Sequence, residues 1–390
     1  MKIALVHDYL VQYGGAERVL ENFCEMFPHA PIYTLVYDEE ATHGRFRGRR
    51  IHTSFLQKWP FAKRRHRIFP PFMPSAIESF DFSGYDVVLS DSSSFAKGVI
   101  TPPETVHICY MHTPMRYAWD DCQRYTREFY YPRPVKMFVP ILMNVIRLWD
   151  KASADRPDRI VANSAFVAGR IRKYYGREAD VLHPPVDIDS FHAGERGEYF
   201  LMVGRLIAYK RHDIAIRAFN RLGKKLLIIG RGPEESRLRA MAKSNIRFLG
   251  RVSDEKLVGY YANCRGFVFP QEEDFGIVAI EAIASGKPVI AYRGGDIVRH
   301  IRDGREGVFF DTQTPEALAE AVRRFEDCSF DAKSIREYAQ RFDKRMFQEK
   351  VLEYIDCARE GTFNNLMQHP SSQRIPHRES SLQIFSSDGS

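Results

Sequence analysis

The feature that most constrains this chain is the alternation of short apolar runs with helical patterns along most of its 390 residues. The first apolar run is followed by a polar loop and then by a helical pattern from Ala16 to about Met26. This alternation is typical of α/β proteins with parallel sheets, in which ligand loops follow the carboxyl ends of strands. The runs that we predict as strands are residues 2–7, 86–89, 106–110, 159–162, 199–203, 226–229, 247–249, 266–269, 288–292 and 307–310.

The run His183-Pro-Pro-Val-Asp187 divides this alternation into two series. Two adjacent prolines restrict the backbone, and a new strand pattern begins soon after them. Because a chain of this length is long for one core, we predict two doubly wound, Rossmann-like domains at residues 1–187 and 188–331. Helical patterning then continues through residues 332–359. The serine-rich segment 360–390 has little apolar content, so we predict that it is disordered.

The net charge of +7 comes from one segment, residues 45–67. It holds nine of the 57 Lys and Arg residues and none of the 50 Asp and Glu residues, so the rest of the chain is close to neutral. Aromatic residues, among them Phe46, Trp59 and Phe61, are interleaved with these cations. This combination suits an anionic membrane surface, and we predict that partner. A solvated basic loop is the alternative, and nucleic acid ranks last because no nucleic-acid-binding pattern accompanies the segment.

Residues 115–150 interrupt the alternation. They are aromatic, contain three prolines and include a largely apolar stretch from Val135 to Trp149. We interpret this stretch as a buried core helix. An acceptor-binding or membrane-facing helix is the functional alternative.

Several patterns of other protein classes are missing from the sequence. No GxGxxG pattern, P-loop or GxSxG elbow occurs, and the six cysteines form neither a CxxC pair nor a Cys/His cluster with zinc spacing. We therefore predict no metal site and no cofactor. The opening MKIALVHDYL is too short and too soon acidic for a signal peptide, and no apolar run approaches the roughly 20 residues of a membrane-spanning helix. We expect a cytoplasmic protein, held at the inner face of the cytoplasmic membrane where the basic segment binds lipid.

The most informative motif is Glu273-Asp-Phe-Gly-Ile-Val-Ala-Ile-Glu281, which follows a predicted strand. We expect Glu273 in the strand-to-helix loop and Glu281 on the second turn of a helix that begins at Ile277. A helix start offers free backbone N–H groups and the positive end of the helix dipole, which suits a phosphate. Two carboxylates that flank this point predict contacts with hydroxyl groups at the two ends of a nucleotide-sugar.

Cations, small residues and a histidine follow other predicted strands. Arg205 and Lys210 come soon after a strand, where two cations suit a diphosphate, although a solvated basic loop is the alternative. Gly14 and Gly15 lie between the first strand and its helix, where small residues let the backbone approach a phosphate or simply form a turn. A lone histidine is commonly structural, but the strand-end position of His112 makes it a site candidate.

Together these residues resemble one family, the retaining, metal-independent GT-B glycosyltransferases of family 4. Four blocks match in order over about residues 1–355, and the block with two glutamates eight positions apart is the most specific. The blocks are His7-Asp-Tyr-Leu10 with Gly14-Gly-Ala-Glu-Arg-Val-Leu20; Val203-Gly-Arg-Leu206 with Lys210; Glu273-Asp-Phe-Gly-Ile277 through Glu281-Ala282; and Ser285-Gly-Lys-Pro-Val-Ile290. The resemblance implies a GT-B fold, with two doubly wound domains facing a cleft.

The resemblance also implies roles for single residues. Arg205 and Lys210 resemble the pair that holds the donor diphosphate. Glu273 resembles the carboxylate that faces the transferred sugar, Glu281 the ribose ligand, and His112 a residue that contacts the sugar near its reacting face. The implied catalytic set is His112, Arg205, Lys210 and Glu273. The implied donor-binding set is Gly14, Gly15, Arg205, Lys210, Glu273, Phe275, Gly276, Ile277, Val278 and Glu281, with the backbone of Gly15 and of residues 275–278 facing the phosphates.

The implied activity is transfer of a hexose to a glycan or lipid-linked oligosaccharide in surface polysaccharide biosynthesis, with mannose from GDP-mannose as the expected donor. Enzymes that use UDP-sugars share the blocks and are the alternative. A nucleotide-dependent oxidoreductase is disfavoured by the missing GxGxxG pattern, and a non-catalytic glycan-binding protein by the intact motif residues. The run Gly294-Gly-Asp-Ile-Val298 lacks the glutamate that the family often carries there, so the role of Asp296 stays open.

Overall fold

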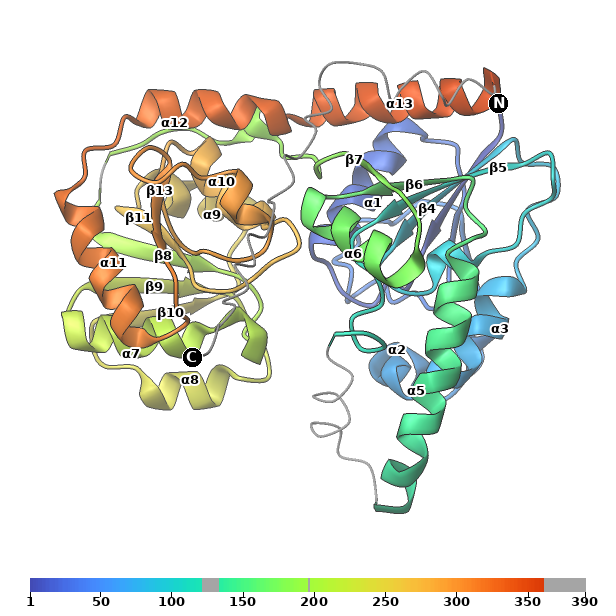
Figure 1. The fold of residues 1–390 in the computed structure, drawn as a ribbon, viewed down its shortest axis with the longest axis horizontal. Helices are drawn as coiled ribbons and strands as arrows, with labels where there is room; N and C mark the ends of the chain where they lie inside the picture. Colours follow the sequence, from blue (N-terminus) through green and yellow to red (C-terminus); the bar gives the residue numbers. More distant parts are fainter. Residues whose placement is uncertain (121–132, 196, 361–390) are drawn as a thin grey trace, which may run out of the picture.

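Two parallel β-sheets form the cores of two domains in the computed structural model, which describes residues 1–120, 133–195 and 197–360. The N-terminal sheet has seven strands in the order β3-β2-β1-β4-β5-β6-β7, and the C-terminal sheet has six in the order β10-β9-β8-β11-β12-β13. Figure 1 shows the domains side by side, with α12 (Ala332–Ala339) and α13 (Lys344–Glu360) running along one edge of both. The predicted fold class, two doubly wound domains, is confirmed.

The N-terminal domain contains three strands that the sequence did not reveal. Its strands are β1 (Ile3–His7), β2 (Ile32–Thr34), β3 (Ile51–Thr53), β4 (Val87–Ser92), β5 (Val106–Met111), β6 (Arg159–Ala162) and β7 (Asp180–Val181). Its helices are α1 (Gly15–Met26), α2 (Ala62–Arg65), α3 (Met73–Glu78), α5 (Arg133–Ser153) and α6 (Ala165–Tyr175). We did not predict β2, β3 and β7, because two or three residues are too few to show a periodic pattern.

β1 shows why the strands of this domain appear as continuous apolar runs. Its five residues are all buried, and successive side chains of a strand point to opposite faces. Ile3 and Leu5 pack in the cluster that contains residues of α1 and α13. Ala4 and Val6 pack in the cluster that contains residues of α3 and α5. Since helices cover both faces of the sheet, the four positions from Ile3 to Val6 are apolar, and His7 at the end of β1 is buried with a carboxylate partner.

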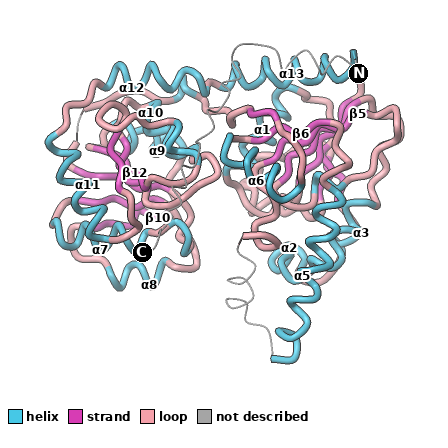
Figure 2. The backbone as a smooth tube through the Cα atoms, in the orientation of Figure 1, coloured by secondary structure: helices cyan, strands magenta, loops and turns pink. Residues whose placement is uncertain are grey.

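The C-terminal domain repeats this arrangement. Its strands are β8 (Tyr199–Val203), β9 (Lys225–Ile229), β10 (Ile246–Gly250), β11 (Gly266–Phe269), β12 (Val289–Tyr292) and β13 (Gly307–Phe310). Its helices are α7 (His212–Leu222), α8 (Glu235–Met241), α9 (Asp254–Ala262), α10 (Ile277–Ala284) and α11 (Pro315–Asp327). Figure 2 shows the strands of this sheet enclosed by helices. α10 is buried from Ala279 to its end, which explains why each of its residues except Glu281 is apolar.

Two segments that lie next to each other connect the domains. Val186, which follows the proline pair, accepts a hydrogen bond from the Lys344 N–H at 3.1 Å. α13 then packs on the N-terminal sheet, where the ring of Phe347 lies 5.6 Å from the rings of Phe23 and Tyr110. The helix α13 is therefore part of the N-terminal core, although it follows the C-terminal domain in sequence (Figure 1).

The prediction of a buried core helix at residues 135–149 was wrong for one face of α5. Met143 and Ile146 are buried, whereas Ile141 and Leu148 are 64% and 66% exposed. The overall apolar content of a stretch does not show which face is covered, and here only one face meets the sheet. The predicted stretch begins at Val135, and the side chains before Val139 lie outside the described part of the chain.

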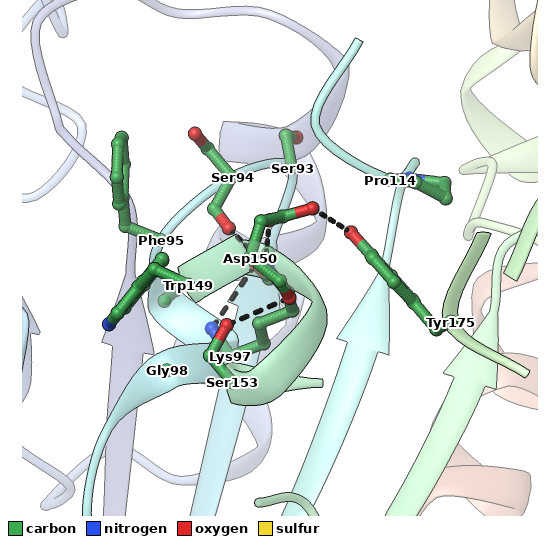
Figure 3. Close-up of polar contacts among 12 residues, drawn as sticks. Ser93, Ser94, Phe95, Lys97, Gly98, Pro114, Trp149, Asp150, Ser153 and Tyr175 are labelled. Carbon is green, nitrogen blue, oxygen red and sulfur yellow. Dashed lines mark hydrogen bonds and ion pairs between the residues drawn. The ribbon is translucent and has the colours of Figure 1, made fainter. Parts of the chain in front are cut away.

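A buried ion pair holds the C-terminal half of α5 in place. The Lys97 ammonium pairs with the Asp150 carboxylate and donates a hydrogen bond to Ser94 O at 2.7 Å. The same carboxylate accepts hydrogen bonds from Tyr175 Oη and Trp119 Nε1, each at 2.8 Å. Figure 3 shows Lys97 and Asp150 meeting between the chain after β4 and the end of α5. A buried charge is stable only with such partners, so removing one of them costs about 3–5 kcal/mol.

The basic segment 45–67 is not one solvated or membrane-facing loop. It contains the edge strand β3, and Phe46 and Leu56 are fully buried in the core. Phe55 and Phe61 remain exposed, at 41% and 67%. Exposed cations lie on both sides of β3, Arg47 and Arg50 before it and Lys63 and Arg64 after it, so the predicted surface character applies to these side chains and not to the whole segment.

Within the described residues, no helix combines the length and the apolar character that crossing a membrane requires. The segment predicted to be disordered lies outside the described residues, apart from Glu360 at the end of α13.

Candidate functional site

Glu273 lies in the loop between β11 and α10, and its carboxylate forms an ion pair with Lys210 Nζ. Lys210 ends a short 3-10 helix after β8, so the two side chains follow the carboxyl ends of neighbouring strands. Both are partly exposed, at 15% for Glu273 and 14% for Lys210. Burial lowers the pKa of Lys210, but the charge of Glu273, its hydrogen bond and the nearby Tyr209 together outweigh burial and raise the pKa above its usual value. Lys210 is therefore held as a cation beside the carboxylate.

Gly276 starts α10 in a backbone conformation that favours glycine. Its φ is 93°, and a Cβ at this position would lie 2.8 Å from the ring of Phe269. No side chain caps this helix start. The first N–H groups of a helix have no partner within the helix, and they carry its partial positive charge. The start of α10 therefore places the positive end of a helix dipole between Glu273 and Glu281, and the anion site that the motif predicts stays a prediction.

The residues around Gly276 offer their backbone more than their side chains. The Phe275 ring is buried and stacks on the imidazole of His183 with 5.2 Å between ring centres. Val278 packs at the edge of the C-terminal core. The side chain of Ile277 faces the other domain, because a Cβ built on Gly15 would lie 3.3 Å from Ile277 Cδ1.

Glu281 is almost fully buried on the second turn of α10. One carboxylate oxygen accepts a hydrogen bond from Tyr261 Oη at 2.8 Å. The other oxygen pairs with the guanidinium of Arg18, which comes from α1 of the N-terminal domain. The predicted ribose ligand is thus held by a cation from across the domain boundary. The sequence prediction missed Arg18, although it stands in the same block as Gly14 and Gly15.

Gly14 and Gly15 lie at the start of α1, directly opposite α10. The Gly14 N–H donates to Glu17 Oε2 at 2.8 Å, so this amide is already occupied. Gly15, the first residue of α1, faces Ile277 across the boundary. Of the two predicted glycines, Gly15 is the better placed to approach a ligand.

Arg205 is exposed and reaches toward the N-terminal domain. Its Nη1 donates a hydrogen bond to Gln12 Oε1 at 2.8 Å. The two cations of the predicted pair therefore contact different partners. Lys210 forms an ion pair with Glu273, and Arg205 binds the loop that precedes α1.

His112 follows β5, and its imidazole ring is held in orientation by the buried carboxylate of Asp91. Its Nε2 lies 2.5 Å from Asp91 Oδ1, and the other oxygen of Asp91 lies 2.8 Å from His7 Nδ1. Burial lowers the pKa of His7, but hydrogen bonds to Asp91 and Glu17 outweigh it and raise the pKa to about 10. Burial raises the pKa of Asp91, but the charges and hydrogen bonds of His112 and His7 together outweigh burial and leave the pKa of Asp91 lowered. Asp91 was missed, although its place at the end of β4 indicates a site residue.

Asp274, inside the glutamate motif, binds two arginines of the N-terminal domain. Its carboxylate pairs with Arg116 at 2.7 Å and with Arg170 at 2.8 Å. Its backbone oxygen accepts a hydrogen bond from Ser164 Oγ at 2.5 Å, and Ser164 also caps α6. The residue next to Glu273 therefore fixes the two domains together.

Asp296 closes the loop in which the family glutamate is missing. Gly295 has a φ of 74°, and a Cβ there would lie 2.3 Å from Glu273 O. The Asp296 N–H donates to the same oxygen at 3.1 Å. The buried Asp296 carboxylate accepts from Phe166 N at 3.1 Å and contacts His300 Nε2 at 2.6 Å. Asp296 thus holds the backbone of Glu273 and the start of α6.

One group of side chains has the composition of a metal site. His183, Asp296 and His300 each place one ligand atom within 4.8 Å of the others. Two of them already share a hydrogen bond, and His183 Nδ1 lies 3.3 Å from Asn163 O. These contacts give all three side chains a structural role behind Phe275, so the group does not by itself indicate a metal.

Two family descriptions match adjacent parts of the chain. Glycosyltransferase Family 4 matches residues 13–190, and Glycosyl transferases group 1 matches residues 186–342. The two matches meet at the segment that connects the domains. The names of both families support the expectation of a transferase.

Individual relatives match part of the chain. A D-inositol 3-phosphate glycosyltransferase of Acidothermus cellulolyticus is 31% identical over 214 residues, which is 46% of this chain and 48% of that protein. An uncharacterised glycosyltransferase of Methanocaldococcus jannaschii is 27% identical over 219 residues, or 54% of this chain and 62% of that protein. The chain spans about half the length of the curated relatives it matches.

Solved structures match nearly the whole chain. HepE of Anabaena in complex with UDP has a TM-score of 0.69 at 16% identity, covering 91% of this chain and 100% of HepE. WaaG, a glycosyltransferase involved in lipopolysaccharide biosynthesis, has a TM-score of 0.67 at 16% identity, covering 90% of this chain and 99% of WaaG. Together with the two family matches, this likeness shows that the chain has the GT-B fold of the group 1 and family 4 glycosyltransferases.

Proposed function

We propose that this chain is a retaining, metal-independent glycosyltransferase that moves a hexose from a nucleotide-sugar to a glycan or lipid-linked oligosaccharide. The observation that carries the proposal is the arrangement around Gly276. An uncapped helix start lies between two carboxylates, with the cation of Lys210 beside the first of them. Such a start binds phosphate, and the carboxylates on either side are hydrogen-bond acceptors for sugar hydroxyls.

In our proposal, the donor extends from Glu281 past the start of α10 to Glu273. Glu281 binds the ribose in place of Arg18, the start of α10 and the Gly15 amide bind the diphosphate, and Glu273 binds the transferred sugar. Arg205 and Lys210 neutralise the diphosphate. The contacts of Arg205 and Lys210 with Gln12 and Glu273 give way to the donor when it binds.

The proposed chemistry needs stabilisation of a leaving diphosphate. As the bond from the sugar C1 to the phosphate oxygen breaks, negative charge builds on that oxygen and the sugar becomes oxocarbenium-like. Lys210, Arg205 and the helix start supply fixed positive charge where the negative charge develops. Retention follows from attack on the same face, with the leaving phosphate accepting the proton of the acceptor hydroxyl. His112 contacts the sugar, and Asp91 fixes its ring.

GDP-mannose is the donor that we propose first, because the block from Glu272 to Ile277 resembles mannosyltransferases of bacterial surface polysaccharides. A UDP-sugar is the second candidate. The structure of HepE with UDP-glucose supports it, since that protein shares the fold over 91% of this chain at a TM-score of 0.67. We also propose a cytoplasmic location, where nucleotide-sugars are made, and a role in surface polysaccharide biosynthesis.

A thermal-shift series with GDP-, UDP- and dTDP-sugars tests the proposal. A ligand at 100 times its Kd stabilises the folded state by about 2.7 kcal/mol, so the true donor raises Tm by several degrees. We expect GDP-mannose to give the largest shift, with no change on adding EDTA. A larger shift with a UDP-sugar selects the second candidate.

Matched variants connect the shift to the site. Lys210→Met removes the cation at Glu273, and we expect it to abolish the shift, whereas Lys256→Met changes an exposed lysine on α9 and keeps it. Absence of a shift with every nucleotide-sugar contradicts the proposed function. A shift with nicotinamide dinucleotide alone would support an oxidoreductase instead.

A further inference from the structure

We propose that one face of the N-terminal domain docks on an anionic lipid bilayer. We call it the docking face; it consists of the exposed side chains of Phe55, Phe61, Ile68, Phe72, Ile141, Val145 and Leu148, with the cations of Lys58, Lys63, Arg64 and Arg65. This inference goes beyond the proposed function because it assigns a partner and a surface whichever sugar is transferred.

Exposed apolar side chains are concentrated on this face. In the described part of the chain, thirteen large apolar side chains are exposed, and seven of them belong to the docking face. The other six are spread over the two domains. Single exposed apolar residues are normal, whereas a concentration of them marks an interaction site.

The outer side of α5 supplies three of the seven apolar side chains of the docking face. Ile141, Val145 and Leu148 follow the i, i+4, i+7 spacing that places residues on one helix face, and they are 58–66% exposed. The opposite side carries Ile146 and Asp150, which are buried against the rest of the domain. Figure 1 shows the N-terminal part of α5 extending beyond the N-terminal sheet. The described part of the fold leaves this stripe uncovered.

Residues 55–72 supply the other four apolar side chains and lie beside α5. The 3-10 helix Pro70–Phe72 contacts α5, and the Phe72 ring lies 4.9 Å from the ring of Trp59. Phe55 packs on the same Trp59 ring at 5.8 Å. Figures 1 and 2 both show α2, which lies within this segment, next to α5. The two sources of apolar surface therefore form one face.

Charge identifies the partner as an anionic surface. Lys58, Lys63, Arg64 and Arg65 are exposed, and the Arg65 guanidinium lies 5.6 Å from the centre of the Phe61 ring. Residues 45–67 contain no acidic residue, and between residues 139 and 153 the one acidic residue, Asp150, is buried. A second copy would bring like charges together, whereas anionic lipid neutralises them while the apolar side chains enter the interface.

The position of the face fits delivery of a lipid-linked acceptor. Residues 55–72 follow the carboxyl end of β3, and α5 belongs to the connection that follows β5. All strand pairs that join β3 to β5 are parallel, so both segments start from the same edge of the sheet as His112. A bilayer on this face lies on the side of the domain where the proposed acceptor enters.

Vesicle co-sedimentation of the full chain tests the proposal. The vesicles contain phosphatidylglycerol and phosphatidylcholine, with pure phosphatidylcholine for comparison, at low and high salt. Each exposed cation near an anionic surface contributes about 1 kcal/mol, so Lys63→Gln with Arg64→Gln and Arg65→Gln lowers partitioning at low salt on the order of 100-fold. Val145→Ser with Leu148→Ser removes the binding that persists at high salt.

Matched variants on other surfaces serve as controls. Met346→Ser with Leu352→Ser changes two exposed apolar residues on α13. Lys225→Gln with Lys256→Gln and Arg323→Gln removes three exposed cations of the C-terminal domain. We expect both control sets to bind vesicles like the unchanged chain. Urea unfolding of every variant verifies that it is folded.

Three outcomes would overturn the proposal. The first is equal binding of the chain to neutral and anionic vesicles, and the second is undiminished vesicle binding by both docking-face variants. The third is a dimer in solution that Val145→Ser with Leu148→Ser dissociates. Such a dimer would make the docking face an interface between two copies of the chain. Donor thermal shifts measured without vesicles stay unchanged in all docking-face variants. Failure of membrane binding is therefore distinguishable from failure of the proposed transferase function.

Discussion

The interdomain site has two walls, a C-terminal wall with Glu273 and Lys210 and an N-terminal wall with Asp91 and His112. The carboxylates of the two walls differ in their burial and in their partners. On the C-terminal wall, Glu273 is partly exposed and pairs with a single flexible cation, Lys210. On the N-terminal wall, Asp91 is fully buried between the imidazoles of His7 and His112. A partly exposed pair exchanges its partner for a ligand at low cost, whereas a buried carboxylate between two rings fixes their orientation. In our proposal, the C-terminal wall binds the ligand and the N-terminal wall positions His112, which contacts it.

Glu273→Gln breaks the binding wall and has the largest expected effect. Loss of a charged contact to the reacting sugar lowers kcat by roughly 10²–10³-fold, while donor affinity changes only a few-fold. Initial rates at saturating donor and acceptor measure this. Glu272→Gln, an exposed neighbouring carboxylate, is the control and keeps its rate. A loss confined to donor affinity would mean that Glu273 only binds.

Asp91→Asn breaks the positioning wall. Without the carboxylate, His112 loses its orientation, and a second partner of this kind typically contributes 10–100-fold to activity, so kcat falls by about that factor. Donor thermal shifts remain, since Asp91 contacts no residue of the C-terminal wall in the described part of the chain. Asp86→Asn, with an exposed carboxylate just before β4, is the control. Equal loss of donor binding and turnover would contradict a positioning role.

Glu281→Gln separates the two carboxylates of the motif. A hydrogen bond to a charged group contributes about 1.5–3 kcal/mol, so we expect donor Kd to rise by roughly 10–100-fold. Turnover at saturating donor stays within a few-fold, because the ribose lies far from the reacting bond. Calorimetric titration and steady-state rates measure the two quantities. A fall in kcat with Kd unchanged would reverse our assignment of Glu273 and Glu281.

Asp274→Asn weakens the contact between the walls. The carboxylate is 16% exposed and pairs with Arg116 and Arg170, so its neutralisation weakens two ion pairs across the domain boundary. We expect the donor KM to rise by roughly 5–10-fold with a smaller change in kcat, and the radius of gyration in scattering to increase. Glu178→Gln, which opens a fully exposed pair with Arg172, leaves both unchanged. Unchanged KM and radius in Asp274→Asn would show that the contact does not hold the domains.

The smallest of the expected effects, near neutral pH, is the change in folding stability with pH. Hydrogen bonds raise the folded pKa of His7 to about 10, against 6.5 for a free histidine. Protonation therefore stabilises the folded state fully below pH 6.5, and this contribution is lost as pH rises from 6.5 toward 10. The free energy of unfolding in urea, measured across this range, should fall on the order of a few kcal/mol. His7→Gln should flatten the curve, and an equal slope in that variant would remove His7 as the cause.

The sequence allowed prediction of the fold class and of the glutamate motif, because both depend on local patterns. Strands covered on both faces are continuous apolar runs, as in β1 and β11, and a carboxylate after such a run lies at the sheet edge that binds ligands. The strand-to-helix loop at Glu273 and the helix position of Glu281 were found in this way. The uncovered side of α5 was not, because composition does not show which helix face meets a neighbour.

The sequence by itself determined two α/β series and the row of candidate donor ligands, since both depend on residues near one another in the chain. Only the tertiary structure decided which partners these ligands have. Arg18 meets Glu281 across 263 positions, and Arg170 meets Asp274 across 104. Such pairs depend on how the connecting segments and α13 position the two sheets relative to each other. No local pattern records that placement, because the geometry of a long-range contact is set by the packing of everything between its partners.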